Sequence, residues 1–259
     1  MEPAKTKRGQ YLSGQSTRTK ILESAVKIIG SSGYHGLALR ALASKSEVAH
    51  ATVVYHFADK ETLLREVILY WENALGLVNC SPDEYSQGVK LEGINFDTYE
   101  DLLLKLMYLA KRPDISDLLS LSSTLISEGS DPEYPAHNYI KRRHEMLFPH
   151  LVAVLRKSRS NDEIRYSSST TAVAETLVTL WYGTALASKY LQDPAEVANL
   201  MSNFLAACIC QTGFPPEKLL QFSDEVPTNL EDIYMQILHY VKNCGMAQYL
   251  KAPEESSCS

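Results

Sequence analysis

Apolar residues recur at helical spacing along almost the whole chain, and patterns typical of β-strands are nearly absent. Within residues 17–31, Ile21, Ala25 and Ile28 lie about one helical turn apart, with further apolar residues between them. This spacing predicts an amphipathic helix, whose end Gly33 marks. The chain is therefore expected to be all-α from its first ordered segment.

Two short helical stretches follow, at 37–43 and 48–57. The four polar residues between them, Ser44 to Glu47, form a turn of the length that joins two helices at a sharp angle. The three segments together predict a small helical head with a helix-turn-helix arrangement.

The remaining pattern predicts a larger helical region, in which Asp59 and the sequence Asp193-Pro194 supply helix starts. Residues 80–96, which contain Pro82, are expected to form an irregular connection, and the tail after Lys251 is expected to be disordered. Helices are predicted at about 59–77, 97–112, 115–128, 135–158, 170–191, 194–212 and 229–243.

Charge is distributed unevenly along the 259 residues. Residues 1–60 hold nine Lys and Arg against four Asp and Glu, a formal net charge of +5, which leaves −11 for the rest because the whole chain carries −6. A basic head on an acidic body is suited to a protein of which only the head approaches a polyanion. Charge alone equally fits a basic disordered tail on an ordinary helical protein.

Composition excludes several other classes of protein. The hydrophobic content of 45% and charged content of 22% are those of a globular protein. No apolar run is long enough to cross a bilayer, and the basic start lacks the apolar segment of a secretory signal. The five scattered cysteines argue against a disulfide framework, so we expect a cytoplasmic protein without a membrane partner.

The block 17–64 resembles the DNA-binding head of the tetracycline-repressor (TetR) family. The resemblance extends more weakly to residue 212, through the loop 131–137 and the two helices joined at Asp193-Pro194. It is carried by the following residues: Arg18, Ile21, Leu22, Ala25, Gly33, Leu42, Ala43, Val48, Thr52, Tyr55, His56, Phe57, Lys60, Leu63 and Leu64.

The resemblance implies a three-helix head (17–62) behind a flexible basic arm (1–16), with a long helix leading into a ligand-binding and dimerisation domain (63–250). The tail 251–259 stays outside these domains. The family dimerises through a four-helix bundle, for which the helices 170–191 and 194–212 are the candidates. Two heads about 34 Å apart, or a small multiple of this, would read a pseudo-palindromic DNA operator.

The helix 48–57 is suited to the major groove because it presents small and hydrogen-bonding side chains. His50 and Thr52 can meet base edges, whereas Lys45, Tyr55 and Lys60 are placed to meet phosphates. His56 is equally well explained as a packed histidine. The full set of predicted DNA-binding residues is Arg18, Arg40, Lys45, His50, Thr52, Tyr55, His56 and Lys60.

The family also implies a small-molecule effector that moves the long helix and releases DNA. The predicted effector pocket combines apolar walls with a few polar anchors. It is formed by Trp71, Met107, Tyr108, Leu118, Ser122, Tyr139, Arg143, Phe148 and Trp181. Each of these residues also fits an ordinary core position.

No catalytic motif stands out, so we expect neither an enzyme nor a cofactor. His137, His144 and His150 are spaced seven and six residues apart, and no cluster of Cys or Asp completes a metal site around them.

The leading hypothesis is a ligand-responsive repressor that binds its operator as a homodimer. Four departures from the family pattern motivate an alternative. Ala38 and Ala49 replace helix-capping residues, Glu47 replaces a glycine in the turn, and Val54 replaces a tyrosine. Each lost cap costs about 1 kcal/mol. The alternative is a ligand- or partner-binding dimer with a weakened head that acts by titration.

Overall fold

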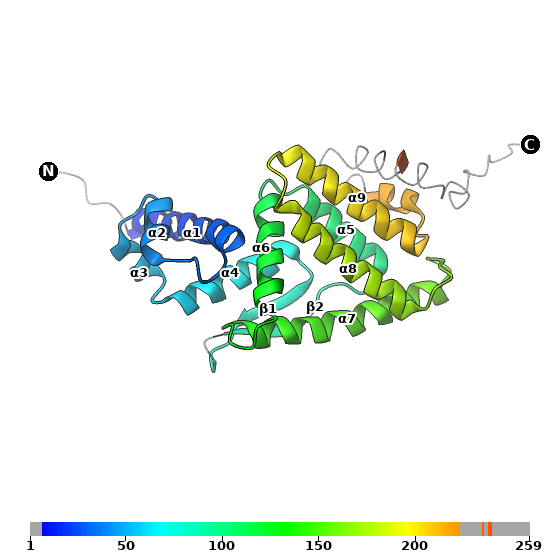
Figure 1. Ribbon diagram of the computed structural model, residues 1–259, viewed down its shortest axis with the longest axis horizontal. Coiled ribbons are helices and arrows are strands. Elements are labelled where there is room, and N and C mark those ends of the chain that lie inside the picture. Colours follow the sequence, from blue (N-terminus) through cyan, green and yellow to red (C-terminus); the bar gives the residue numbers. More distant parts are fainter. Residues whose placement is uncertain (1–6, 87, 223–234, 236–237, 240–259) are drawn as a thin grey trace, which may run out of the picture. The chain divides into compact units, whose positions relative to one another are not determined.

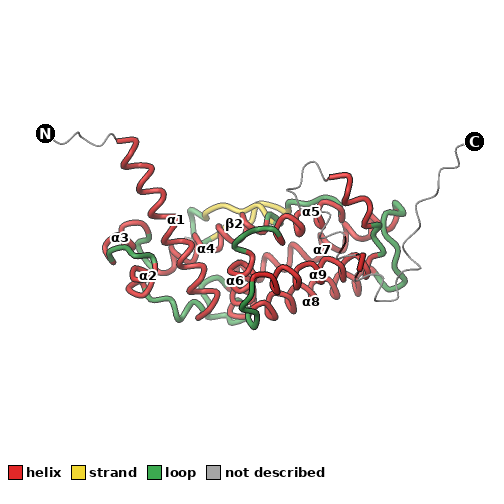
Figure 2. The backbone as a smooth tube through the Cα atoms, turned by 90° about the horizontal axis from the view of Figure 1, so that it is seen from above, coloured by secondary structure: helices red, strands yellow, loops and turns green. Residues whose placement is uncertain are grey.

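The computed structural model describes residues 7–86, 88–222, 235, 238 and 239, and these residues form two compact units. Unit 1 comprises residues 1–93 and 116–145, and unit 2 comprises residues 94–115 and 146–259. Figures 1 and 2 label the elements of both units. The predicted helix 229–243 and the tail 251–259 lie largely or wholly outside the described residues.

The predicted all-α class is confirmed for the described part of the chain, with one short two-stranded sheet added. Unit 1 contains the following elements: α1 (Lys7–Ser32), α2 (Leu39–Lys45), α3 (His50–His56), α4 (Lys60–Leu75), β1 (Val78–Pro82), β2 (Val89–Ile94), α6 (Ile115–Glu128) and the first part of α7 (His137–Ser160). Unit 2 contains α5 (Tyr99–Ala110), the remainder of α7, α8 (Thr170–Ser188), α9 (Pro194–Thr212) and the 3₁₀ helix η1 (Pro216–Phe222).

The three predicted head helices are present, and their apolar faces meet in one core. Ile21 and Ile29 of α1, Leu42 of α2 and Val53 of α3 are all fully buried. Helix α1 begins at Lys7, so it includes most of the segment expected to be a flexible arm.

Helix α4 leads out of the head and has well-defined ends. Asp59 caps it by accepting a hydrogen bond from the Thr62 N–H at 2.7 Å, as predicted. Its buried face includes Leu63 and Leu64 near the head and Trp71 further along. The helix ends at Leu75 because Gly76 adopts a left-handed conformation with φ 66°, which glycine tolerates best.

The connection 80–96 was expected to be irregular, and this expectation is wrong. β1 and β2 pair in a two-stranded sheet. In β2, half-buried Val89 and Leu91 alternate with exposed Lys90 and Glu92, which is the alternation of a half-buried strand. Each strand is short, and Pro82 and Gly88 lie close to the strand ends. The alternating pattern is therefore too brief to be recognised between two long helical segments.

Unit 2 is built around α5, α8 and α9, and α8 and α9 run side by side (Figures 1 and 2). Asp193 caps α9 by accepting from the Ala195 N–H, so the predicted start of this helix is confirmed. The helix ends at Gly213, whose φ is 60°; a Cβ there would approach the Arg165 carbonyl oxygen to 2.5 Å. The buried Tyr99 hydroxyl donates to the Cys208 carbonyl at 3.1 Å and ties α5 to α9.

The unit boundaries do not follow the predicted domain division at residues 62 and 63. Unit 1 joins the three-helix head to α4, α6 and the residues of α7 up to Glu145. The head is therefore part of a larger compact body that contains the helix leaving it.

Candidate functional site

Helix α3 buries one face and presents the other to solvent. Val53 and, directly after the helix, Phe57 are fully buried. On the opposite side, Tyr55 is 84% exposed and Val54 is 40% exposed. Ala51 is also exposed. The inner face therefore anchors α3 to the head core, and the outer face is free to meet a partner.

The turn between α2 and α3 is fixed by Ser46 and Glu47. The buried Ser46 Oγ donates a hydrogen bond to the Leu42 carbonyl at 2.7 Å. Glu47 adopts φ 54°, in the region that favours glycine. Its carboxylate accepts a hydrogen bond from Lys20 Nζ at 2.6 Å, and this bond lowers the pKa of Glu47. The positive charge of Lys20 thus partly offsets the repulsion expected between Glu47 and a phosphate.

The first turns of α2 and α3 lack side-chain caps, as the sequence predicts. The N-cap residues Ala38 and Ala49 have extended backbones and make no side-chain hydrogen bond. Packing of Leu42 and Val53 into the head core takes the place of capping in holding these two short helices.

Four of the predicted DNA-binding residues lie exposed on or beside α2 and α3, namely Arg40, Lys45, His50 and Tyr55. Thr52 and His56 are half-buried, and the His56 ring packs edge-on against Tyr55 with ring centroids 5.2 Å apart. The exposed set thus combines two cations of α2, Arg40 and Lys45, with His50 and Tyr55 of α3.

Arg18 and Lys60 have contacts within unit 1 itself. The Arg18 guanidinium hydrogen-bonds Glu66 of α4 and lies 5.1 Å from the centroid of the Phe57 ring. Lys60 Nζ lies 4.1 Å from the centroid of the Tyr34 ring. Both cations help to hold α4 on the head, and a role for either in binding DNA stays a prediction.

Helix α6 is joined to the end of α1 by hydrogen bonds that the sequence did not indicate. Ser120 Oγ and Thr124 Oγ1 both donate to the Gly30 carbonyl, at 2.9 and 3.0 Å. The Tyr34 N–H donates to both carboxylate oxygens of Glu128, at 2.9 and 3.2 Å. These contacts connect α6 to the end of α1 and to the loop that follows it.

Unit 1 contains a fully buried carboxylate, Glu72 on α4, whose exposed fraction is 0%. Its Oε1 atom accepts a hydrogen bond from the Tyr139 hydroxyl at 2.7 Å and another from Arg143 Nε, both on α7. Its Oε2 atom is buried and has no hydrogen-bond partner. Burial and the nearby Glu72 charge raise the pKa of Tyr139, so this hydroxyl stays protonated and donates.

Trp71 and Ser122 extend this buried cluster to α6. The Trp71 Nε1–H donates to Ser122 Oγ at 2.6 Å, and Ser122 Oγ in turn donates to the Leu118 carbonyl at 2.8 Å. The Arg143 guanidinium lies 4.6 Å from the centroid of the Trp71 ring, a cation–π arrangement. Consecutive residues of α4 thus face α6 and α7 through specific polar contacts.

The predicted effector residues divide between the two units. Trp71, Leu118, Ser122, Tyr139 and Arg143 lie in unit 1. Met107, Tyr108, Phe148 and Trp181 lie in unit 2. Trp71, Ser122, Tyr139 and Arg143 make side-chain contacts with Glu72 or with one another, and we call these five residues the Glu72 cluster. Glu72 itself was missed; the available signal was a carboxylate beside Trp71 on the apolar face of α4.

Helix α8 exposes large apolar side chains. The exposed fractions of Tyr182 and Leu186 are 38% and 52%, and Tyr190, just beyond the helix, is 79% exposed. Trp181 is half-buried and packs against Phe204 of α9, with ring centroids 5.6 Å apart. This surface belongs to the helix pair predicted to form the dimer interface.

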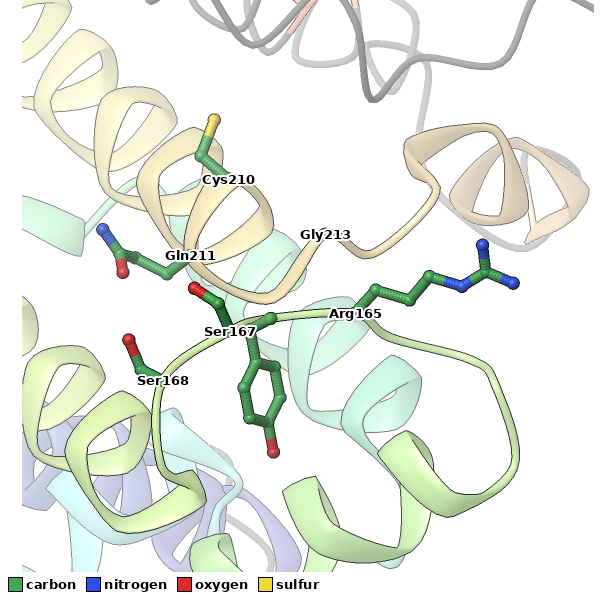
Figure 3. A pocket seen from close by; sticks show the side chains of 7 residues that line it. Arg165, Ser167, Ser168, Cys210, Gln211 and Gly213 are labelled. Atoms are coloured by element: carbon green, nitrogen blue, oxygen red, sulfur yellow. The ribbon is translucent and has the colours of Figure 1, made fainter.

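An open cavity of about 470 Å³ lies in unit 2, between the loop before α8 and the end of α9. Figure 3 shows Ser167 and Ser168 on the loop facing Gln211 of α9, with the Arg165 side chain extending away. None of the nine predicted effector residues lines this cavity, whose lining is Arg165, Tyr166, Ser167, Ser168, Cys210, Gln211 and Gly213.

Membrane-spanning helices and clusters of metal-ligating side chains are both absent from the described residues. No helix there combines the length and the apolar character that a membrane crossing requires. No group of three or more His, Cys, Asp or Glu is placed to hold a metal ion. His137 and His150 instead lie 2.9 and 2.6 Å from the carbonyl oxygens of Gly129 and Phe96.

Comparison with known proteins identifies the head. Residues 21–67 match the family model described as bacterial regulatory proteins, tetR family. The match covers α1 from Ile21, the whole of α2 and α3, and half of α4. The head of the chain is therefore similar to the DNA-binding region of tetR regulators. A curated relative, the HTH-type transcriptional regulator UidR of Escherichia coli K12, is 26% identical over 195 residues, which is 74% of this chain and 91% of UidR.

Solved structures of tetR regulators share the fold. A TetR-family transcriptional regulator from Agrobacterium tumefaciens superposes with a TM-score of 0.52 at 18% identity, over 75% of this chain and 98% of that chain. TylP, a tetR regulator from Streptomyces fradiae, gives a TM-score of 0.50 at 20% identity, over 85% of this chain and 98% of that chain. The chain thus shares the helical fold of these proteins, with a head that matches the tetR family model.

Proposed function

We propose that this transcriptional regulator is a repressor that binds a pseudo-palindromic operator as a homodimer and is released by a small molecule bound beside Glu72. The observation that carries the proposal is the exposed outer face of α3, which includes Tyr55 and Val54, together with the exposed cations Arg40 and Lys45 of α2. The matched family model supports a DNA partner for this face.

In this proposal α3 enters the major groove, and the preceding helix crosses the backbone. Arg40 and Lys45 then meet phosphates and set the register, whereas the outer face of α3 meets base edges. The exposed Tyr55 hydroxyl is a further phosphate donor. The pair Lys20–Glu47 is exposed, so bulk water and salt screen its charges before DNA arrives.

Homodimerisation is assigned to α8 and α9. Tyr182, Leu186 and Tyr190 offer apolar area that a second copy would bury. Small residues such as Gly183, beside which an added Cβ meets nothing within 4 Å, permit close approach of another helix. Two heads per dimer match the two half-sites of an operator.

The effector is assigned to the Glu72 cluster for an energetic reason. An ion pair that is almost fully buried is weak evidence for stability, because apolar residues of similar volume often serve as well or better. The unpartnered Oε2 atom adds a desolvation cost of about 1–3 kcal/mol or more. A ligand that donates a hydrogen bond to this atom would recover that cost.

The coupling to DNA runs through α4 and α6. Helix α4 carries Trp71 and Glu72 and also the Glu66 carboxylate that binds Arg18 of the head. Helix α6 carries Ser122 in the cluster and Ser120 at the Gly30 carbonyl. A ligand that shifts either helix therefore acts on the end of α1 and on the support of α3.

One observation favours the alternative function, a ligand- or partner-binding dimer whose weakened head acts by titration rather than by binding DNA. Ala38 and Ala49 leave the starts of α2 and α3 without side-chain caps, and the turn holds Glu47 rather than glycine. A head of this kind binds DNA weakly if the core does not hold the two helices in place.

One experiment separates the two candidates. The purified full-length protein is incubated with a random-sequence duplex library at about 0.15 M salt, where nonspecific contacts weaken. The repressor proposal expects enrichment of an inverted repeat, with binding lost in Lys45→Ala and retained in the control Lys141→Ala, an exposed lysine of α7. No enrichment by folded, dimeric protein would favour titration.

The effector step has its own test. Small molecules are screened for release of the enriched duplex, and active compounds are re-examined with Glu72→Gln. Because Glu72→Gln leaves Arg143 without its ion-pair partner, the variant is first shown to be folded by circular dichroism; the folded variant should bind the duplex and lose its response by tenfold or more. An unchanged response would move the effector site away from Glu72.

A further inference from the structure

Helix α3 lacks the long polar and charged side chains that most often read DNA bases. Its seven residues, His50 to His56, include no Arg, Lys, Asn, Gln, Asp or Glu. The exposed positions are His50, Ala51, Val54 and Tyr55, and Ala49 directly before the helix is also exposed. The face that would meet base edges therefore carries the methyl groups of alanine and valine between the rings of His50 and Tyr55.

The apolar positions share one side of the helix. Residues three apart are neighbours on a helix surface, so Ala51 and Val54 lie one above the other. Val53 and Phe57 hold the opposite side in the core, where both are fully buried. The rotation of α3 about its axis is thus fixed, with Tyr55 the most exposed side chain at 84% and Ala51 and Val54 exposed beside it.

The major groove offers only a few partners to such a surface. Guanine is read by Arg or Lys, adenine by Asn or Gln, and cytosine by Asp or Glu. Thymine alone carries a methyl group, and apolar side chains contact it. Of the remaining polar groups of α3, Thr52 and His56 are half-buried and His56 packs on Tyr55, whereas His50 is exposed at the first position of the helix.

We propose that α3 reads its operator half-site through thymine methyl groups, which Ala51 and Val54 contact in the major groove. The half-site then carries T·A pairs at the positions beneath these two residues. This inference rests on the proposed function, because it presupposes that the head binds DNA through α3. Arg40 and Lys45 supply phosphate contacts and leave base readout to the methyl groups.

The size of the effect follows from the area of a methyl group. Removing one buried methyl contact lowers affinity about fourfold. Two such contacts in each half-site give about 16-fold per half-site if they act independently. Val54 contributes more than Ala51, because its side chain has two methyl groups.

The test replaces each thymine of the enriched duplex in turn with deoxyuridine, which keeps the hydrogen-bonding edge and removes only the methyl group. Dissociation constants are measured by fluorescence anisotropy for the full-length protein and for Val54→Ala. For the full-length protein, we expect deoxyuridine to weaken binding about fourfold at one or two positions per half-site. For Val54→Ala, deoxyuridine at one of these positions should cause no further loss of affinity. Tyr85→Ala, a fully exposed position in the loop between β1 and β2, serves as the control variant and should keep the wild-type pattern.

The outcomes distinguish this inference from the proposed function. Tight, sequence-specific binding that changes by less than twofold with deoxyuridine at every position would overturn the methyl readout alone. Half-sites made only of G·C pairs would do the same. No specific binding by folded dimeric protein would overturn both.

Discussion

Removing the charge of Arg143 should destabilise unit 1 more than any exposed substitution. Arg143→Met keeps much of the side-chain volume and deletes the only cation bound to Glu72 among the described residues. Glu72 is fully buried and the Arg143 side chain is only 12% exposed. Solvent therefore cannot replace the lost partner.

The expected magnitude is about 3–5 kcal/mol, the range for breaking a buried ion pair by deleting one partner. Tyr139→Phe removes only one hydrogen bond to Glu72 and should cost about 1.5–3 kcal/mol, because the acceptor is charged. The double variant Glu72→Leu with Arg143→Met removes both charges together and should recover most of the loss.

Urea unfolding at one fixed protein concentration measures these differences, with helical circular dichroism and tryptophan fluorescence as two probes. The matched control is Arg142→Met, an exposed neighbour on α7, which should change stability by less than 0.5 kcal/mol or so. A loss below about 1 kcal/mol for Arg143→Met, or a double variant as unstable as the single one, would refute the reasoning.

Three further outcomes follow from the structure. Asp59→Ala should destabilise α4 by about 1 kcal/mol at neutral pH. The hydrogen bond from Thr62 lowers the pKa of Asp59, so the wild-type advantage should disappear as the pH falls below 3.8, which urea titrations across pH can measure. Glu47→Gly should relieve a positive φ, stabilise the head by up to about 1 kcal/mol and tighten binding of the enriched duplex; weaker binding would contradict the role given to Glu47. Burial raises the pKa of the Cys80 thiol to about 11, so its alkylation by iodoacetamide at pH 8 should be more than tenfold slower than that of free cysteine, and equal rates would contradict its placement.

Local signals made the head and several helix ends predictable from sequence. Asp59 and Asp193 cap α4 and α9 as predicted, because an N-cap depends on residues within one turn. The inward positions of Val53 and Phe57 follow from helical periodicity and are fully buried. The predicted phosphate and base contacts depend on DNA and stay predictions.

Features that depend on distant partners were not predictable. Glu72 meets Tyr139 and Arg143, which lie 67 and 71 residues further along the chain. The position of Glu72 beside Trp71 on the apolar face of α4 suggests burial, but nothing near it in the sequence identifies Tyr139 and Arg143 as its partners. The β1–β2 pair was missed for a related reason, since a short strand is recognised only when its partner is known.

The salt dependence of operator binding tests the central claim most directly. If Arg40 and Lys45 each meet one phosphate in both heads of a dimer, four counterions are released and the logarithmic slope of affinity against salt is about −3.6. Affinity should then fall on the order of 100-fold between 50 and 200 mM salt. Lys45→Ala should halve the slope, and Lys141→Ala should leave it unchanged. A slope near zero, or one that Lys45→Ala does not change, would contradict the account of how this head binds DNA.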